Sequence, residues 1–236
     1  MNRVINFEIV RAKTLKSTWI FPAIGIGFSW FLAAIFIGDI SPNGDGTMPT
    51  IVQVVNNAYS PLSIFFITIV FAQAFGHEYR DGTMRLTLSA FPNRLQVYIA
   101  KLIVPAVITV VSAMISCAGI ALIFVQDERV DNSGLLQATL RHSAFSLMWG
   151  LIVAAVVIFT RNMAAGIAGV VVWTIILESL VGSMLATKFE KLPDYLPLSQ
   201  GLIWSQNGGL AHLAVIVIAT VLLIVLSALK FINRDA

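Results

Sequence analysis

The chain has 236 residues, of which 58% are hydrophobic and only 11% are charged, and its formal net charge is +3. Soluble domains carry about 25% charged residues, so this composition excludes an ordinary soluble domain and indicates a protein that is solvated by a bilayer. The basic residues are few and collect at the ends of apolar stretches, which is typical of membrane topology and argues against a nucleic-acid partner. The single cysteine, Cys117, excludes an intrachain disulfide.

Residues 1–17 are too polar to cross a membrane. Apolar residues recur at near-helical spacing from Val4 to Leu15, with basic residues between them. This pattern predicts an amphipathic helix that lies along the inner membrane surface, and a partly ordered basic tail is the alternative. The apolar stretch that follows is about 20 residues long, which exceeds the core of a cleaved signal peptide and predicts a retained first span.

Six apolar stretches predict six transmembrane helices. They cover residues 18–38, 60–75, 102–125, 144–160, 163–186 and 210–231. With both termini inside the cell, only four of the 15 Lys and Arg residues fall on outer segments, namely Arg129, Arg141, Lys188 and Lys191. This asymmetry predicts an all-α, multi-pass protein of the cell membrane with cytoplasmic N- and C-termini. The whole chain, residues 1–236, is expected to form one domain.

The connections between these spans differ in character. Residues 39–59 contain no Lys or Arg and predict an external loop with a short helix at about 49–57, and residues 126–143 are placed outside as well. Residues 187–209 contain Pro193 and Pro197, so they are too broken for a span and too apolar for a free loop. They predict a re-entrant or an interfacial hairpin, and the sequence does not decide between the two. In the third span, small residues repeat every four positions and predict close helix packing; they are Ser112 with Ser116, and Ala113 with Cys117 and Ala121.

The chain lacks the motifs of several enzyme classes. It contains no G-x-x-x-x-G-K-[ST], H-E-x-x-H or G-x-S-x-G sequence, and its three histidines lie on different segments. We therefore expect neither an enzyme nor a metal site. The only acid within a predicted span is Glu178, in the outer third of the fifth span. An acid at this depth is costly, so Glu178 either lines or gates a pathway, or reaches the outer headgroups.

The most polar and basic interruption between two spans is the segment 77–101. Met84, Leu88 and Phe91 lie at positions i, i+4 and i+7, which predicts a short helix with one apolar stripe. Asp81 or Thr83 is the expected N-cap, and Pro92 is expected to end the helix. Such a helix either lies on lipid headgroups or docks into a groove of a cytoplasmic partner, and the residues alone leave both open.

This segment, GHEYRDGTMRLTLSAFPNR followed by a lysine seven residues later, resembles the signature of ABC-2 type permeases of ABC exporters. The shared pattern is an acid, a Gly-Thr step, a basic residue, a Leu-rich turn, Pro and Arg, and then a Lys that opens the third span. The matching residues are Glu78, Gly82, Thr83, Arg85, Leu88, Pro92, Arg94 and Lys101. The resemblance extends over the chain, from the basic N-terminal helix to the Pro-rich segment before the last span.

The resemblance implies the membrane permease subunit of an ATP-binding-cassette exporter. A coupling helix would then dock into a separate cytoplasmic ATP-binding subunit, which would bind the ATP, so that this chain would hold no cofactor. The docking residues would be Glu78, Arg80, Gly82, Thr83, Arg85, Leu88, Pro92 and Arg94. A second permease subunit, identical or a sister chain, would complete the pathway for a drug, an antimicrobial peptide or a lipid-like molecule. The alternatives are a secondary transporter and a non-transporting membrane signalling or assembly protein.

Overall fold

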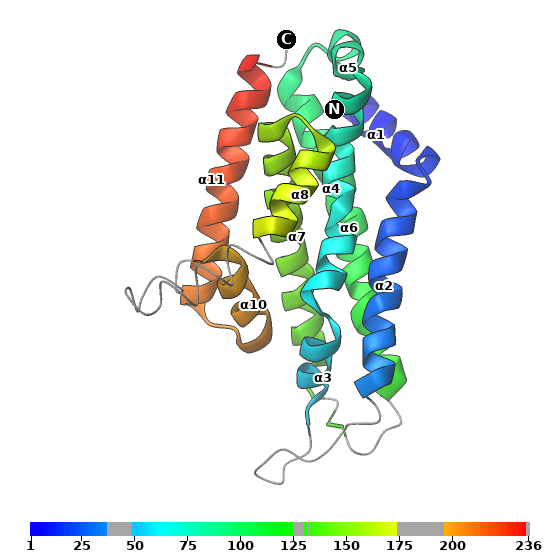
Figure 1. The fold of residues 1–236 in the computed structure, drawn as a ribbon, viewed down its shortest axis with the longest axis vertical. Helices are drawn as coiled ribbons and strands as arrows, with labels where there is room; N and C mark the ends of the chain where they lie inside the picture. The colour runs from blue at the N-terminus through cyan, green and yellow to red at the C-terminus, as the bar shows by residue number, and fades with distance from the viewer. Residues whose placement is uncertain (37–48, 125–129, 132, 174–195, 235–236) are drawn as a thin grey trace.

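A computed structural model describes residues 1–36, 49–124, 130–131, 133–173 and 196–234. The regular secondary structure of the described part is helical, apart from an isolated bridge between Thr50 and Asp131, and short turns connect several of the helices. Long helices run side by side along the long axis of the molecule (Figure 1). The all-α prediction is therefore confirmed.

Among the described residues, five helices are long and apolar enough to cross a membrane, judged by length and composition. They are α2 (Ser17–Phe36), α4 (Pro61–Asp81), α6 (Arg94–Phe124), α7 (Leu135–Thr160) and α11 (Leu210–Arg234). The predicted fifth span, 163–186, is represented by the shorter apolar helix α8 (Met163–Val172). The rest of that span, including Glu178, lies outside the described residues, so the six-span count stays a prediction.

Several long helices extend beyond the predicted spans. α4 continues six residues past the predicted end at 75, α7 starts nine residues before the predicted start at 144, and α6 starts at Arg94 instead of 102. At 1.5 Å per residue the 31-residue α6 is about 46 Å long, whereas the hydrocarbon core is about 30 Å thick. Hydropathy predicts only the apolar part of such a helix, and its polar turns project beyond that part.

Shorter helices lie at both ends of this bundle. α1 (Asn2–Thr14) and α5 (Met84–Ala90) lie at the same end as the C-terminal end of α11, and we call this the α5 end (Figure 1). At the opposite end, α3 (Ile51–Ala58) begins with a capping box between Thr50 and Gln53. α10 (Pro197–Asn207) represents the described part of the Pro-rich segment.

Small residues allow the helices of the core to approach closely. A Cβ atom on Gly25 of α2 would lie 2.8 Å from the Ser63 carbonyl oxygen of α4, and one on Gly150 of α7 would lie 2.3 Å from the Phe71 ring. The predicted small-residue ridges of α6 are all buried; they comprise Ser112, Ala113, Ser116, Cys117 and Ala121. Their packing role is confirmed.

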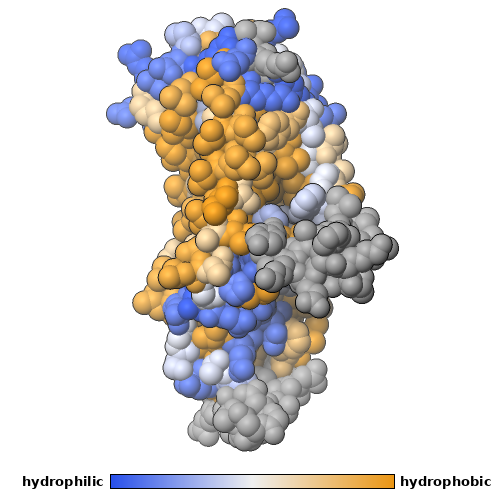
Figure 2. Space-filling model, turned by 90° about the vertical axis from the view of Figure 1, so that its left-hand side faces the viewer, coloured by the Kyte–Doolittle hydropathy of each residue, from blue (hydrophilic) through white to orange (hydrophobic). Residues whose placement is uncertain are grey.

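The outer surface between the two ends is apolar. Exposed leucine, isoleucine and valine side chains cover α11, including Ile218, Val221 and Leu222, which are 66%, 56% and 57% exposed. Figure 2, which looks onto the side of the molecule that carries α11, shows this apolar band below a polar cap at the α5 end, with a second polar region farther down. A continuous band of this kind is suited to contact with lipid chains.

Candidate functional site

Two tight turns place α5 between α4 and α6. α4 ends in a left-handed C-cap at Gly82, whose φ of 67° favours glycine, and the Thr83 N–H donates to the Glu78 carbonyl at 3.1 Å. Thr83 then occupies the N-cap position of α5 without a side-chain hydrogen bond. After Pro92, the Asn93 side chain accepts a hydrogen bond from the Gln96 N–H at 3.1 Å at the start of α6. These turns fix α5 at the tip of two core helices.

One face of α5 packs on the protein and the other is free. Met84 and Thr87 are buried, and Leu88 and Phe91 pack partly buried against the core, so the predicted apolar stripe faces inward. The Phe91 ring also contacts Phe7 of α1, with ring centroids 5.7 Å apart. Arg85 is exposed on the outer face, and beside it Leu86 is 69% exposed. The residues alone did not identify Leu86, because it lies off the stripe whose spacing predicted the helix.

A buried charge quartet lies directly behind this end of the bundle, and it consists of Glu8, Arg11, Glu78 and Lys101. The Lys101 ammonium is fully buried and donates to Glu8 Oε1 at 2.7 Å and to Glu78 Oε1 at 2.5 Å. The Arg11 guanidinium donates to the second Glu8 oxygen at 3.1 Å and to Glu78 Oε1 at 2.9 Å. Two carboxylates and two cations therefore share one site, and their formal charges cancel.

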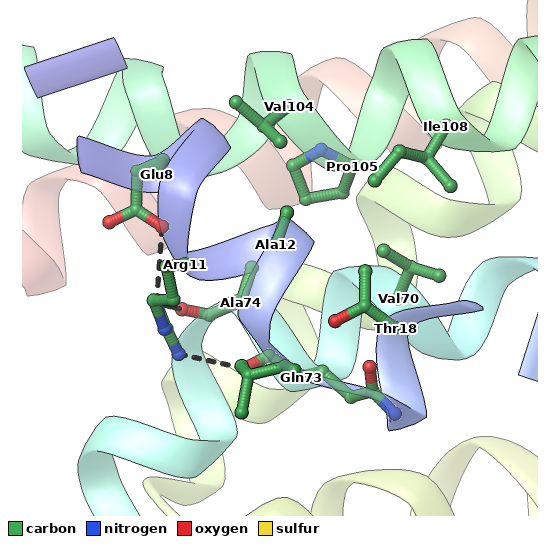
Figure 3. A pocket seen from close by; sticks show the side chains of 11 residues that line it. Glu8, Arg11, Ala12, Thr18, Val70, Gln73, Ala74, Val104, Pro105 and Ile108 are labelled. Carbon is green, nitrogen blue, oxygen red and sulfur yellow. Dashed lines mark hydrogen bonds and ion pairs between the residues drawn. The ribbon is translucent and has the colours of Figure 1, made fainter. Parts of the chain in front are cut away.

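The charge quartet joins three helices that are far apart in sequence. Glu8 and Arg11 come from α1, Glu78 from the last turns of α4, and Lys101 from α6. Arg11 also donates to the backbone carbonyls of Gln73 and Ala74 at 3.2 and 2.9 Å, and Figure 3 shows Glu8 and Arg11 beside these α4 residues. Buried ions are costly to desolvate and are retained when each is paired and hydrogen-bonded. The quartet therefore fixes α1 to the two helices that carry α5.

The N-terminal helix buries an acid that its apolar spacing did not predict. The buried residues of α1 are Val4 and Glu8, whereas the apolar residues Phe7 and Val10 are 42% and 60% exposed. Glu8 is stable in the interior because it is paired with Arg11 of its own helix and with Lys101 of α6. Sequence reasoning missed Glu8; the available signal was a lone acid three residues before Arg11 in an otherwise basic segment.

Side chains from α6 and α11 tie the last helix to the same end. The Arg94 guanidinium donates to the Ile232 carbonyl at 2.7 Å, and the Tyr98 hydroxyl contacts the Ser227 hydroxyl at 2.8 Å. The Lys230 ammonium donates to the Phe159 carbonyl near the C-terminus of α7 at 2.7 Å. Cations at the C-terminal ends of helices satisfy free carbonyls and the helix dipole.

The residues predicted to dock a partner therefore divide into two groups. Exposed residues are available at the α5 end, and they are Arg80, Gly82, Thr83, Arg85 and Pro92. Arg80 is paired with its neighbour Asp81 at 2.8 Å. By contrast, Glu78 is buried in the charge quartet, Leu88 is part of the inward stripe, and Arg94 contacts α11. These three are placed to support α5 from behind.

A small cavity adjoins the charge quartet between α1, α2, α4 and α6. It has a volume of about 20 Å³ and is lined by residues including Thr18, Gln73 and Pro105 (Figure 3). The Gln73 side chain is 1% exposed, and neither its amide nitrogen nor its oxygen has a hydrogen-bond partner among the described residues. A cavity of this size holds about one water molecule, which would satisfy Gln73.

A larger cavity lies farther from the α5 end, where α2, the start of α4 and α8 meet. Its volume is about 390 Å³, and its lining is almost entirely apolar, including Phe28, Leu32, Phe65 and Val171. Binding sites for small organic molecules commonly have volumes of about 300–1,000 Å³ and such apolar walls. This cavity is therefore large enough for a lipophilic molecule.

Comparison with protein families identifies the family of the chain. The family model described as "ABC-2 family transporter protein" matches residues 4–177, which is most of the chain and includes α1, the charge quartet and α5. The chain belongs to the ABC-2 transporter family. It is thus a transmembrane transport component, and ABC-2 permeases generally act with an ATP-binding subunit. Comparison with curated proteins gave no match.

Proposed function

We propose that this ABC-2 protein is the membrane subunit of an ATP-driven exporter, and that α5 is the helix through which a separate cytoplasmic ATP-binding subunit acts on it. The observation that carries the proposal is the two-sided construction of α5. Its inner face is fixed to the bundle, while Arg85 and Leu86 project from the outer face. An exposed leucine beside a cation is a suitable anchor for a partner groove with an apolar pocket and an acidic rim.

The route for force from α5 into the membrane follows its attachments. α5 continues directly into α4 and α6, and the charge quartet adds α1 to the same unit. A partner that pushes on α5 would move these helices together, because separating them would expose unpaired charges in the protein interior. The chain has no phosphate-binding Gly-rich loop of its own, so the ATP is expected on the partner.

The substrate class that fits best is lipophilic. The cavity between α2, α4 and α8 has an almost fully apolar lining. Drugs, antimicrobial peptides with apolar side chains, and lipid-like molecules share this chemistry. We further propose that two such subunits, identical or paired with a sister chain, enclose the pathway, with both termini in the cytoplasm.

The test is co-purification of the ATP-binding subunit from the native host in mild detergent. Leu86→Asp is expected to remove the partner almost completely, because a charge would enter an apolar contact. The matched control is Leu136→Asp on α7: Leu136 is 72% exposed, and like Leu86 it lies in the first turn of its helix. An acid in the first turn is favourable to the helix in both variants, so folding is equally little affected.

Two outcomes would contradict the proposal. If the wild-type chain purifies without any ATP-binding protein, the ATP-driven mechanism is wrong. If the partner is retained equally by Leu86→Asp and Leu136→Asp, the partner binds elsewhere and α5 is not the contact.

A further inference from the structure

The outward surface where α1 meets α2 combines apolar and basic residues. α1 ends at Thr14 and α2 starts at Ser17, and we call residues 9–20 the elbow. Val10, Trp19 and Ile20 in the elbow are 60%, 51% and 52% exposed. Lys13 and Lys16 are exposed beside them. This combination is typical of surfaces that lie at a membrane interface.

The charge quartet makes this surface purely cationic. Glu8 is the only acidic residue in the first 38 positions. Its side chain is 5% exposed, and its two oxygens are bound by Lys101 and Arg11. The remaining charged side chains of this segment, apart from Arg11, are Arg3, Lys13 and Lys16, and all three are exposed. α1 therefore presents cations without a neighbouring acid of its own.

The position of Trp19 places the elbow at the edge of the apolar band. The indole N–H donates to the Ala12 carbonyl at 3.0 Å, so the ring lies across the elbow with its only donor satisfied and its apolar surface half exposed. Beyond it the exposed residues of α2 continue as apolar side chains such as Ile24 and Phe31. Figure 1 shows α1 at the outer edge of the bundle, joined to the end of α2. Aromatic residues collect at this boundary between lipid chains and headgroups.

We propose that the elbow is a binding site for anionic phospholipid, in which Lys13 and Lys16 contact the headgroup phosphate and Val10, Trp19 and Ile20 lie among the first acyl carbons. A second protein is the weaker candidate, since the exposed apolar residues continue into the apolar face of α2. The two lysines are attracted to a headgroup with a net negative charge, whereas a zwitterionic headgroup has no net charge to attract them. The inference does not depend on ATP or on α5.

The experiment measures lipid preference at the elbow in the full-length protein. A bimane label on Val10→Cys reports quenching by spin-labelled phosphatidylglycerol or phosphatidylcholine in mixed vesicles; the native Cys117 is fully buried in α6 and is replaced by Ala. Each basic residue near an anionic surface contributes about a fivefold preference. Quenching is therefore expected to favour phosphatidylglycerol several-fold at 0.1 M salt and to lose most of this preference at 1 M salt, where charges are screened within about 3 Å.

Variants identify the residues responsible. Lys13→Gln with Lys16→Gln is expected to bring the ratio of the two lipids close to one, while Lys13→Arg with Lys16→Arg keeps it. Arg85→Gln removes the same charge from α5 and is expected to leave the ratio unchanged. Equal quenching by both lipids, a ratio unaffected by the double Gln variant, or no quenching by either lipid would overturn the proposal, and the last result would indicate that protein covers the elbow. Should the double Gln variant fail to insert, the salt titration of the labelled parent decides. The lipid preference at the elbow is expected whether or not an ATP-binding subunit co-purifies with the chain, so the two proposals can fail separately.

Discussion

Replacing Lys101 with Met tests whether the charge quartet holds the α5 end together. The Lys101 ammonium is fully buried and contacts both carboxylates of the quartet. Its removal leaves Glu8 and Glu78 inside the protein with Arg11 as the only cation of the quartet. Breaking a buried ion pair in this way costs about 3–5 kcal/mol, mostly because the remaining charge is left unpaired. For a chain of this size, each kcal/mol corresponds to about 2–4 °C in melting temperature, so we expect a decrease of about 6–20 °C.

The assay is thermal unfolding of the purified protein in one detergent at one scan rate, followed by intrinsic fluorescence. Lys13→Met is the matched control, because it makes the same substitution at an exposed lysine of α1 and is expected to change the melting temperature by less than about 2 °C. A second variant, Lys101→Met with Glu8→Gln, restores equal numbers of acids and cations, since Arg11 and Glu78 remain paired at 2.9 Å. It is expected to recover about half of the loss.

The result that would refute this reasoning is a melting temperature of Lys101→Met close to that of Lys13→Met. Strictly additive effects of Lys101→Met and Glu8→Gln would equally contradict it, because residues that share one ion-pair network are expected to couple by about 0.5–3 kcal/mol. Either outcome would show that water or another group compensates for the missing ammonium.

Further predictions concern helix packing and the attachment of α11. A Cβ atom on Gly119 of α6 would lie 2.1 Å from the Trp30 indole nitrogen, so Gly119→Ala is expected to destabilise the protein by about 1–3 kcal/mol. Gly27→Ala, with no atom within 4 Å, is the control and should be neutral or slightly stabilising in the same melting assay; equal effects of the two would contradict the packing. Arg94→Met removes the 2.7 Å hydrogen bond to the Ile232 carbonyl and is expected to cost about 1–2 kcal/mol. Hydrogen exchange of the last turn of α11 should rise in this variant, and unchanged exchange would show that the contact contributes nothing.

The sequence predicted most of the fold because apolar length and small-residue spacing are local signals. The first predicted span, 18–38, agrees with α2, and the helix with Met84 and Leu88 on one side is present as α5. Helix ends were predicted less well. Polar turns such as Leu135–Ser143 of α7 continue a helix beyond its apolar part, and hydropathy carries no information about them.

The sequence predicted where the short helix α5 lies in the chain, but it predicted only some of the contacts around it. Arg85 is exposed at the tip as expected, whereas Glu78 is turned inward toward residues from α1 and α6. Glu8 is 70 positions before Glu78 in the chain and 93 before Lys101, and a single sequence has no signal for contacts over such separations. The outward face of α1 was likewise decided by the burial of Glu8, which only the packed structure reveals.

Pro105 lies one turn after Lys101 in α6, and it weakens the backbone hydrogen bonding of the helix at this point. Proline has no N–H, so the Lys101 carbonyl lacks the usual donor four residues later, and helices bend at such positions. The turns from Arg94 to Lys101 are bound to α1, α4 and α11 by ion pairs and hydrogen bonds, whereas the turns after Pro105 are joined to α2 by the Trp30 indole, which donates to the Ser116 carbonyl at 3.2 Å. Pro105 is therefore the position at which α6 bends most easily, and it directly follows the turns from Arg94 to Lys101 that are bound to other helices. The ion pairs of α6 lie on the N-terminal side of Pro105, so bending at this position would leave them in place.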